Sequence, residues 1–267
     1  MDLQRLLDDQ NDIYSVVLLA AVAATMLWEV WLPRRAPAVP RNRRWRLNFL
    51  LLFVNMLVLY AVVPVSTVTL AFVVNSAGWG LLNQVQIPFV AALVLSMLLM
   101  DLAKYGQHYA LHRVPLLWRM HRVHHSDPDL DVTTSLRFHP LETIVSVLMD
   151  ALVIVAIGVP AVAVVLYRLA RVTASTVVHG NVRIPPGVER LLRFVLVTPD
   201  MHRIHHSVLE HEQKSNLSGG LSWWDHVFGT YVRAPTADYR TMPLGLSGYS
   251  DARASSLRAA LTDPFAT

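Results

Sequence analysis

Long apolar runs separated by polar segments are the main pattern along this chain. Three such runs lie in the first hundred residues and cover 13–32, 49–65 and 87–100. Glu29 is the only charged residue in them. Each run is long enough, or nearly so, to cross a hydrocarbon core of about 30 Å as a helix. The pattern therefore predicts three membrane-spanning helices in the N-terminal part.

A fourth apolar stretch, from Thr143 to Val178, is interrupted by charges and by a turn signal. Asp150, Arg168 and Arg171 introduce the charges, and Gly158-Val159-Pro160 breaks the helical pattern. This stretch predicts a helical hairpin in the membrane. The pattern does not decide whether its two helices cross the whole bilayer. Because only helices and closed barrels satisfy their backbone groups in lipid, we expect an all-α integral membrane bundle.

Charge placement sets the expected orientation. The loop after the first run is rich in arginine, whereas the segment before that run carries four aspartates and one arginine. The positive-inside rule then places 34–46 on the cytoplasmic side. The uncharged stretch 66–86 is expected to stay outside or to dip into the membrane, and the histidine clusters described next face the cytoplasm. Since the acidic N-terminus lacks the basic region of a secretory signal, the first run is expected to remain as an anchor.

Composition narrows the function classes. The chain of 267 residues is 54% hydrophobic with a mean hydropathy of +0.39, above the range of soluble domains. The net charge of +4 is explained by a basic loop at anionic headgroups, and no basic stretch is interleaved with aromatics as a nucleic-acid site would be. The absence of cysteine excludes disulfides, thiolate zinc sites and iron–sulfur clusters held by this chain alone.

A repeated heptapeptide carries the candidate chemistry. MHRVHHS at 120–126 returns as MHRIHHS at 201–207, and in each copy the histidines fall at i, i+3 and i+4. This spacing places three imidazoles on one face of a helix. A further pair stands at i, i+4 just upstream. The eight histidines in these clusters are His108, His112, His121, His124, His125, His202, His205 and His206.

So many imidazoles imply two metal ions, because one tetrahedral ion needs only four ligands. Imidazole suits zinc, copper, nickel and iron alike. Iron can activate O2 and attack an unactivated C–H bond, whereas zinc would serve hydrolysis. Two alternatives therefore stand beside an oxygenase. One is a zinc-dependent membrane hydrolase, for which no nucleophile motif is present, and the other is a non-catalytic metal carrier or haem protein, whose histidines would be expected inside opposed spans.

Beyond the clusters, an ordered set of motifs spans Asp101 to Tyr231. The motifs are Asp101-x-x-x-Tyr105-x-x-His108-x-x-x-His112, LWRMHRVHHSD at 117–127, Thr134-x-x-Arg137-Phe138-His139-Pro140-x-Glu142, His179-Gly180-Asn181, HRIHHS at 202–207 and Trp224-Asp225-x-x-Phe228-Gly229-Thr230. Together they resemble the sterol desaturase and fatty acid hydroxylase superfamily. The chain departs from the motifs at Tyr109, where many members of the superfamily have arginine directly after the first histidine. This difference affects a contact around the metal ligands and does not affect a ligand itself.

The resemblance implies a membrane-bound non-haem di-iron oxygenase with an all-helical fold, whose cytoplasmic helices hold two iron ions. Such an enzyme hydroxylates or desaturates a lipid-like substrate with O2. Because the chain shows no flavin, haem or cysteine-cluster motif, electrons are expected from an external ferredoxin or cytochrome b5-type donor with its reductase. Zinc is expected as a substitute in purified protein. A bacterial inner membrane is the expected location, and nucleic acid is not an expected partner.

The same resemblance supplies the ligand set. The eight clustered histidines are expected to be catalytic as metal ligands, and His179 and His139 join them as metal ligands. His211 and His226 fall outside the spacing and are expected to be ordinary polar residues. Trp223 and Trp224 are expected to anchor at the membrane interface. Carboxylates near the clusters are expected to accept the other imidazole N–H, or to cap a helix in the case of Asp200. They are Asp101, Asp127, Glu142, Asp200 and Asp225.

These expectations divide the chain into three regions. Residues 1–100 form the transmembrane region, 101–235 form the catalytic region with its membrane hairpin at about 143–178, and 236–267 form a C-terminal tail.

Overall fold

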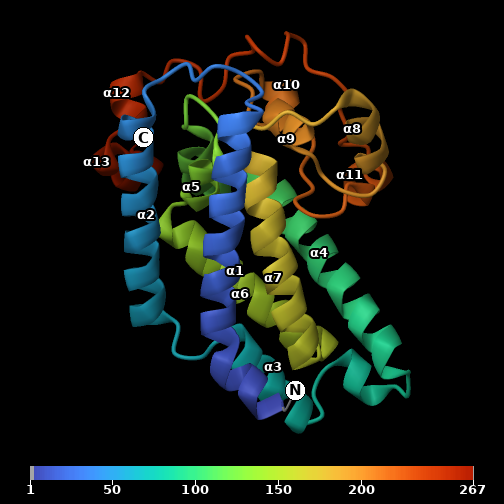
Figure 1. The fold of residues 1–267 in the computed structure, drawn as a ribbon. Helices are drawn as coiled ribbons and strands as arrows, with labels where there is room; N and C mark the ends of the chain where they lie inside the picture. The colour runs from blue at the N-terminus through green and yellow to red at the C-terminus, as the bar shows by residue number, and fades with distance from the viewer. Residues whose placement is uncertain (1–2, 267) are drawn as a thin grey trace.

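The computed structural model describes residues 3–266, and within that range every regular element is a helix (Figure 1). The long helices are α1 (Leu3–Trp31), α2 (Arg41–Val62), α3 (Thr67–Ser76), α4 (Phe89–Arg113), α6 (Pro140–Ile157) and α7 (Ala161–His179). The short ones are η1 (Leu81–Gln84), α5 (Pro115–His125), η2 (Val132–Leu136), α8 (Pro186–Leu192), α9 (Pro199–His205), α10 (Glu210–Gln213), α11 (Trp223–Val227), α12 (Asp251–Ala254), α13 (Leu257–Thr262) and η3 (Asp263–Phe265). The all-α prediction is confirmed.

Five segments of the described chain are long and apolar enough to cross a membrane. They are 11–31, 41–84, 89–113, 140–157 and 161–179. The three predicted runs overlap the first three of these segments. Both arms of the predicted hairpin, α6 and α7, also reach spanning length, so the protein is a multi-pass integral membrane protein.

The turn between α6 and α7 follows from its sequence. Gly158 adopts φ +76°, a left-handed conformation that glycine reaches without steric cost, and it ends α6. Pro160 precedes the first turn of α7. Gly80 lies against this turn so closely that a Cβ there would come within 2.2 Å of the Gly158 nitrogen. The loop before α4 therefore packs directly on the hairpin.

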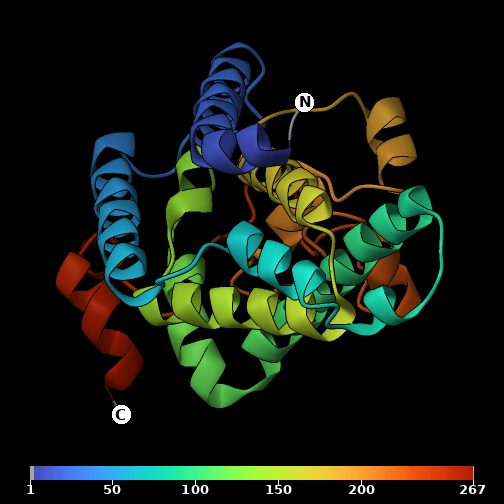
Figure 2. The same ribbon diagram turned by 90° about the horizontal axis from the view of Figure 1, so that it is seen from below.

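The uncharged stretch 66–86, expected to stay outside the membrane or to dip into it, contains α3. This helix packs against both α6 and α7 (Figure 2). Val68, Ala71 and Val74 are fully buried there among residues of the hairpin such as Ile154 and Val164. Burial of this apolar face stabilises the end of the bundle that lies farthest from the histidines.

The histidine-bearing segments gather at the opposite end, together with the loop 32–40 between α1 and α2 (top of Figure 1). Arg44, in the first turn of α2, joins the start of that helix to the chain after α5. Its guanidinium lies 2.5 Å from Asp127 and 2.6 Å from Asp131, and the residue is 1% exposed. Arg34 pairs with Asp200 at 2.8 Å. The expectation that the whole basic loop faces lipid headgroups is thus wrong for these arginines, because they hold neighbouring segments together.

Candidate metal centre

Four segments bring nine histidines to one buried site. α4 ends with His108 and His112, α7 ends with His179, and the two copies of the repeated heptapeptide form α5 and α9 as the spacing predicted. All nine are buried except His108, which is partly so. They are His108, His112, His121, His124, His125, His179, His202, His205 and His206.

The nine form two groups, in each of which one nitrogen per ring lies within 4.8 Å of all the others. The first group is His108, His112, His121, His125 and His205, and the second is His124, His179, His202 and His206. The groups adjoin, since the rings of His125 and His206 stack with centroids 4.5 Å apart.

The two heptapeptides contribute to these groups in exchanged roles. In α5 the i, i+4 pair His121 and His125 enters the first group and the i+3 residue enters the second. In α9 the i, i+4 pair His202 and His206 enters the second group, and the i+3 residue, His205, enters the first. The near-identical peptides therefore produce a pseudo-symmetric pair of sites, each completed by one or two histidines from α4 or α7.

Nitrogen positions in both groups fit metal coordination. Nε2 of His121 lies 3.1 Å from Nε2 of His108 in the first group. In the second group, Nε2 of His179 lies 3.0 Å from that of His124 and 2.9 Å from that of His202. Two nitrogens bound at about 2.1 Å and at right angles are separated by about 3.0 Å.

Several buried ring nitrogens have no hydrogen-bond partner among the described residues. They are both nitrogens of His112 and of His125, Nδ1 of His202 and His206, and Nε2 of His205. Burying polar atoms without a partner is costly. A pair of metal ions would resolve that cost for the nitrogens that face into the groups.

Backbone carbonyls fix the orientation of four rings. Nδ1 of His108 donates to the carbonyl of Leu217 at 2.6 Å, and Nδ1 of His205 donates to that of Ser215 at 2.9 Å. The Nδ1 atoms of His124 and His179 donate to the carbonyls of Arg137 and Ser175 in the same way. A donating Nδ1 leaves the Nε2 lone pair available to a metal.

Among the described carboxylates, Glu142 alone takes this role. Its Oε1 accepts a hydrogen bond from Nδ1 of His121 at 2.7 Å, and its Oε2 is buried without a partner. The expectation that carboxylates in general would orient the histidines is therefore wrong, because backbone carbonyls from the chain around Ser215 and Leu217, from Arg137 and from α7 itself take that role.

The other four carboxylates bind elsewhere. Asp101 accepts from the indole of Trp224 at 2.8 Å, and Asp225 accepts from the backbone N–H groups of Leu217 and Ser218. Asp127 pairs with Arg44, and Asp200 with Arg34. Asp200 does not cap α9 either, since the Thr198 side chain accepts from the Met201 N–H at the start of that helix. These carboxylates support the segments around the site.

The remaining predicted residues lie outside both groups. His139 begins α6, where its Nδ1 accepts the N–H of Leu141 at 3.2 Å, so the structure does not bring it to the other histidines. His211 contacts Thr236, and the ring of His226 lies 4.1 Å from that of Tyr231. Tyr109 is 41% exposed.

Asn216 is a residue whose role the sequence did not indicate. It has φ +49° and its side-chain nitrogen donates to the carbonyls of Met201 and Val232. This arrangement holds the neighbouring carbonyls of Ser215 and Leu217 against the histidines. No residue pattern marks such a contact in advance, because every residue carries a carbonyl.

Burial keeps the rings in the neutral form that binds metal. In α5 and α9, burial and the neighbouring imidazoles hold the pKa values of His124, His125, His202 and His206 well below the ordinary value of a histidine. For His205, burial lowers the pKa to about 3. A deprotonated imidazole is the form required of a ligand.

A cavity of about 570 Å³ opens beside the centre, between the membrane helices. Five of the nine histidines line it, namely His108, His121, His124, His179 and His202. Its wall is mainly apolar and includes Leu52, Met56, Leu111, Phe138 and Val172. The ring of Phe138 stacks on His124 at 4.8 Å. An apolar molecule in this cavity would reach the histidines directly.

The model of the fatty acid hydroxylase family matches residues 93–230, which carry all nine histidines. The chain belongs to that family. Among its relatives, the ornithine lipid hydroxylase OlsE of Rhizobium tropici is 29% identical over 61% of this chain, and the alkylglycerol monooxygenases of Xenopus tropicalis and Homo sapiens are 31% and 28% identical over 52% and 49%. The chain covers 48%, 30% and 28% of the lengths of these relatives. No solved structure matches it.

Proposed function

We propose that this protein is a membrane-bound di-iron oxygenase that hydroxylates a lipid-like substrate. The observation that carries the proposal is the pair of adjacent, buried all-histidine groups beside an apolar cavity. Family membership and the names of the relatives, which describe lipid hydroxylation and monooxygenation, support the same reaction class. Hydroxylation is accordingly favoured over desaturation.

The two groups would each hold one ion through the Nε2 atoms, and His139 is not part of this ligand set. Iron bound there would supply the activation of O2 and the oxidation of an unactivated C–H bond. The chain itself supplies the rest. Carbonyls and Glu142 fix the rings, Phe138 and the aliphatic wall exclude water, and the cavity orients the substrate chain toward the histidines.

The cavity wall also carries charges at membrane depth. Lys104 pairs with Asp150 at 2.7 Å, and Arg168 and Arg171 line the same cavity. Charged side chains within a bilayer are costly unless they meet a polar partner. Lys104 and Arg171 have partners within the protein, since Arg171 donates to the Gly219 carbonyl at 3.0 Å. A charged wall in an otherwise apolar cavity suits an amphiphilic molecule, and we infer that the substrate has a polar group that lies against this wall when its chain lies at the histidines.

Electrons are proposed to come from a ferredoxin or cytochrome b5-type donor with its reductase. The histidine end of the bundle lies with the basic loop, so the positive-inside rule places both on the cytoplasmic side, in a bacterial case at the inner membrane. A soluble donor could then approach the centre without crossing the bilayer.

The test is reconstitution of the whole protein in lipid vesicles, loaded with ferrous iron under argon. Mass spectrometry should find a product heavier by one oxygen atom, with the label from ¹⁸O2, only when O2 and a reducing system are both present. The zinc-loaded protein is the matched control and should be inactive. Turnover of lipid without O2 or reductant, by the zinc form, would instead establish the hydrolase alternative.

A further inference from the structure

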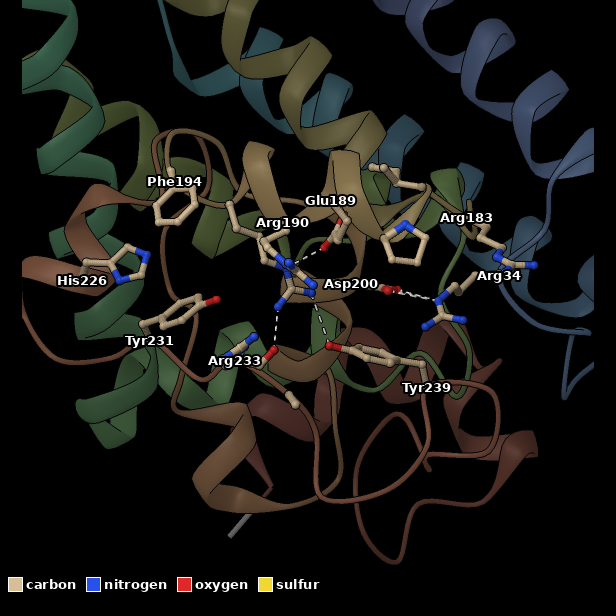
Figure 3. A pocket seen from close by; sticks show the side chains of 14 residues that line it. Arg34, Arg183, Glu189, Arg190, Phe194, Asp200, His226, Tyr231, Arg233 and Tyr239 are labelled. Atoms are coloured by element: carbon tan, nitrogen blue, oxygen red, sulfur yellow. Dashed lines mark hydrogen bonds and ion pairs between the residues drawn. The ribbon is translucent and has the colours of Figure 1, made fainter.

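A second cavity of about 570 Å³ lies outside the metal centre and is lined by five arginines (Figure 3). They are Arg34, Arg183, Arg190, Arg193 and Arg233, and we call this cavity the arginine pocket. Among the residues that the structure describes, the carboxylates that line it are Glu189 and Asp200. Five cations against two anions leave an excess of three positive charges.

Two of the arginines form ion pairs with carboxylates of the same pocket. Arg34 pairs with Asp200 at 2.8 Å and lies over the ring of Tyr239, and Arg193 pairs with Glu189 at 2.7 Å. These contacts make the floor of the pocket rigid.

The other three, Arg183, Arg190 and Arg233, are exposed. Among the residues whose side chains the structure describes, none gives them an ion pair, and Figure 3 shows their side chains around one cavity. Arginines that line a cavity without a carboxylate partner suit a phosphate or carboxylate ligand, because each guanidinium offers a planar fork of N–H donors.

A large exposed apolar surface adjoins this pocket. Its members come from α8, from the segment after it and from α11, and Leu191 and Val227 are 70% and 69% exposed. We call it the apolar patch, and it consists of Val188, Leu191, Phe194, Val195, Leu196, Trp223, Val227 and Phe228. Phe194 belongs to both the patch and the pocket.

The two halves of the patch are joined to each other. Trp223 donates its indole N–H to the carbonyl of Phe194 at 2.8 Å, and Leu196 bridges to Leu221. The patch is therefore one fixed surface rather than two mobile segments.

The patch is also continuous with a membrane helix. Trp224 and Leu221 donate to Asp101 of α4, and the ring of Phe228 stacks on Tyr105 of α4 at 5.2 Å. These contacts fix the patch beside α4, which is one of the segments long and apolar enough to span a membrane.

We propose that the arginine pocket binds the headgroup of an anionic phospholipid whose acyl chains lie on the apolar patch. The charge of the pocket, the apolar character of the patch and their junction at Phe194 match the two ends of such a lipid. The bound lipid fixes the depth at which α8 and α11 lie in the membrane, on the side of the bundle that carries the metal centre.

The test measures lipid binding to the full-length protein in detergent by native mass spectrometry, with phosphatidylglycerol, phosphatidylcholine and inorganic phosphate as probes. The parent protein should prefer phosphatidylglycerol. The double variant Arg190→Gln/Arg233→Gln should bind it about 30-fold more weakly, since each arginine near an anionic headgroup contributes about fivefold.

A matched control removes the same charge elsewhere. Arg240→Gln/Arg258→Gln changes two exposed arginines outside the pocket and outside the basic segment 34–46, and should keep the affinity of the parent. Equal losses in the two double variants would show general charge attraction, and an unchanged affinity in the pocket variant would show no site. Either result overturns the proposal. Melting temperature and metal content verify that both variants are folded.

The patch variant Leu191→Ser/Val227→Ser identifies the source of the anion. It should weaken binding of phosphatidylglycerol and leave binding of inorganic phosphate unchanged. If it binds phosphatidylglycerol as the parent does, the ligand is a soluble phosphate compound and the lipid site is refuted. If the arginine variant keeps its lipid affinity but is reduced more slowly by a donor protein, the pocket is a docking site for an acidic protein and the proposal fails as well.

Discussion

At the scale of single residues, His205 shows how a ligand can belong to one helix and serve the site of another. It lies in α9, yet its Nε2 joins the group formed mainly by α4 and α5. We expect His205→Ala to abolish turnover and to remove metal from the first group, because His108 and His121 are fixed by the Leu217 carbonyl and by Glu142, and the buried helix α9 offers no second ring to replace the lost one. Metal analysis and product assays provide the measurement.

The control for that experiment is His211→Ala, which alters an exposed histidine outside both groups. It should retain metal and activity. Two metal ions per chain together with full turnover in His205→Ala would show that the first group is not a metal site.

Glu142 gives a second prediction at this scale. Glu142→Ala removes the acceptor that fixes Nδ1 of His121, and loss of such an outer contact typically lowers metal affinity about 10- to 100-fold. Glu142→Gln keeps an oxygen acceptor and should recover most of the affinity. Competition with a metal chelator measures both variants. Equal affinities for Ala, Gln and the parent would mean that Glu142 does not orient His121.

At the scale of elements, Arg44 links α2 to the segment between α5 and η2. It pairs with Asp127 and Asp131, both buried. Burial raises the pKa of Asp127, but Arg44 and Arg137 together with hydrogen bonds outweigh this effect, so the pKa of that carboxyl is lowered. Arg44→Met leaves these carboxylates without their partner and should lower the free energy of unfolding by about 3–5 kcal/mol.

Denaturation of the purified protein in one detergent, monitored by circular dichroism, tests this prediction. Arg43→Met, on the exposed side of the same helix turn, is the control and should change stability little. A similar small effect for both variants would contradict the structural role of Arg44.

At the scale of the whole molecule, the buried histidines make the metal-free protein sensitive to acid. Burial lowers the pKa of His205 to about 3, whereas in the unfolded chain it is about 6.5. Between these values the unfolded state binds more protons than the folded state. The free energy of unfolding is therefore constant above about pH 6.5 and falls as the pH drops below it.

Chemical denaturation of the metal-free protein over a series of pH values measures this slope. The metal-loaded protein should begin to lose stability at lower pH, because protons must displace the ions. His211→Gln, the exposed control, should leave the profile unchanged. A flat profile from about pH 7.5 to 5 would contradict the burial of neutral histidines.

Topology is also a property of the whole molecule. Reporters fused after Arg41 and after Thr267 should report the cytoplasm, and one fused near Ser76 should not, because the basic loop sets the orientation. In the structure the turn at 63–66 and α3 lie at the end opposite to the histidines (Figure 1). A cytoplasmic signal near Ser76 would reverse the orientation and remove the argument for a soluble cytoplasmic donor.

The helical membrane fold and the presence of a histidine-rich centre could both be predicted from the order of residues alone. Both depend on local periodicity: apolar runs of spanning length predict helices, and i, i+3, i+4 spacing places imidazoles on one helix face. The turn at Gly158 and the helices α5 and α9 were predictable for the same reason. The division into three regions remains a prediction from those patterns.

Which histidines share a group, and what orients them, depends on how the helices pack in three dimensions. The exchange of His124 and His205 between the two groups depends on how α5 and α9 face each other, which spacing within one helix cannot show. Likewise, carbonyls such as that of Leu217 reach the rings because Asn216 and Asp225 shape their loop. Long-range contacts of this kind arise from packing, so the residues that make them have no distinctive local pattern.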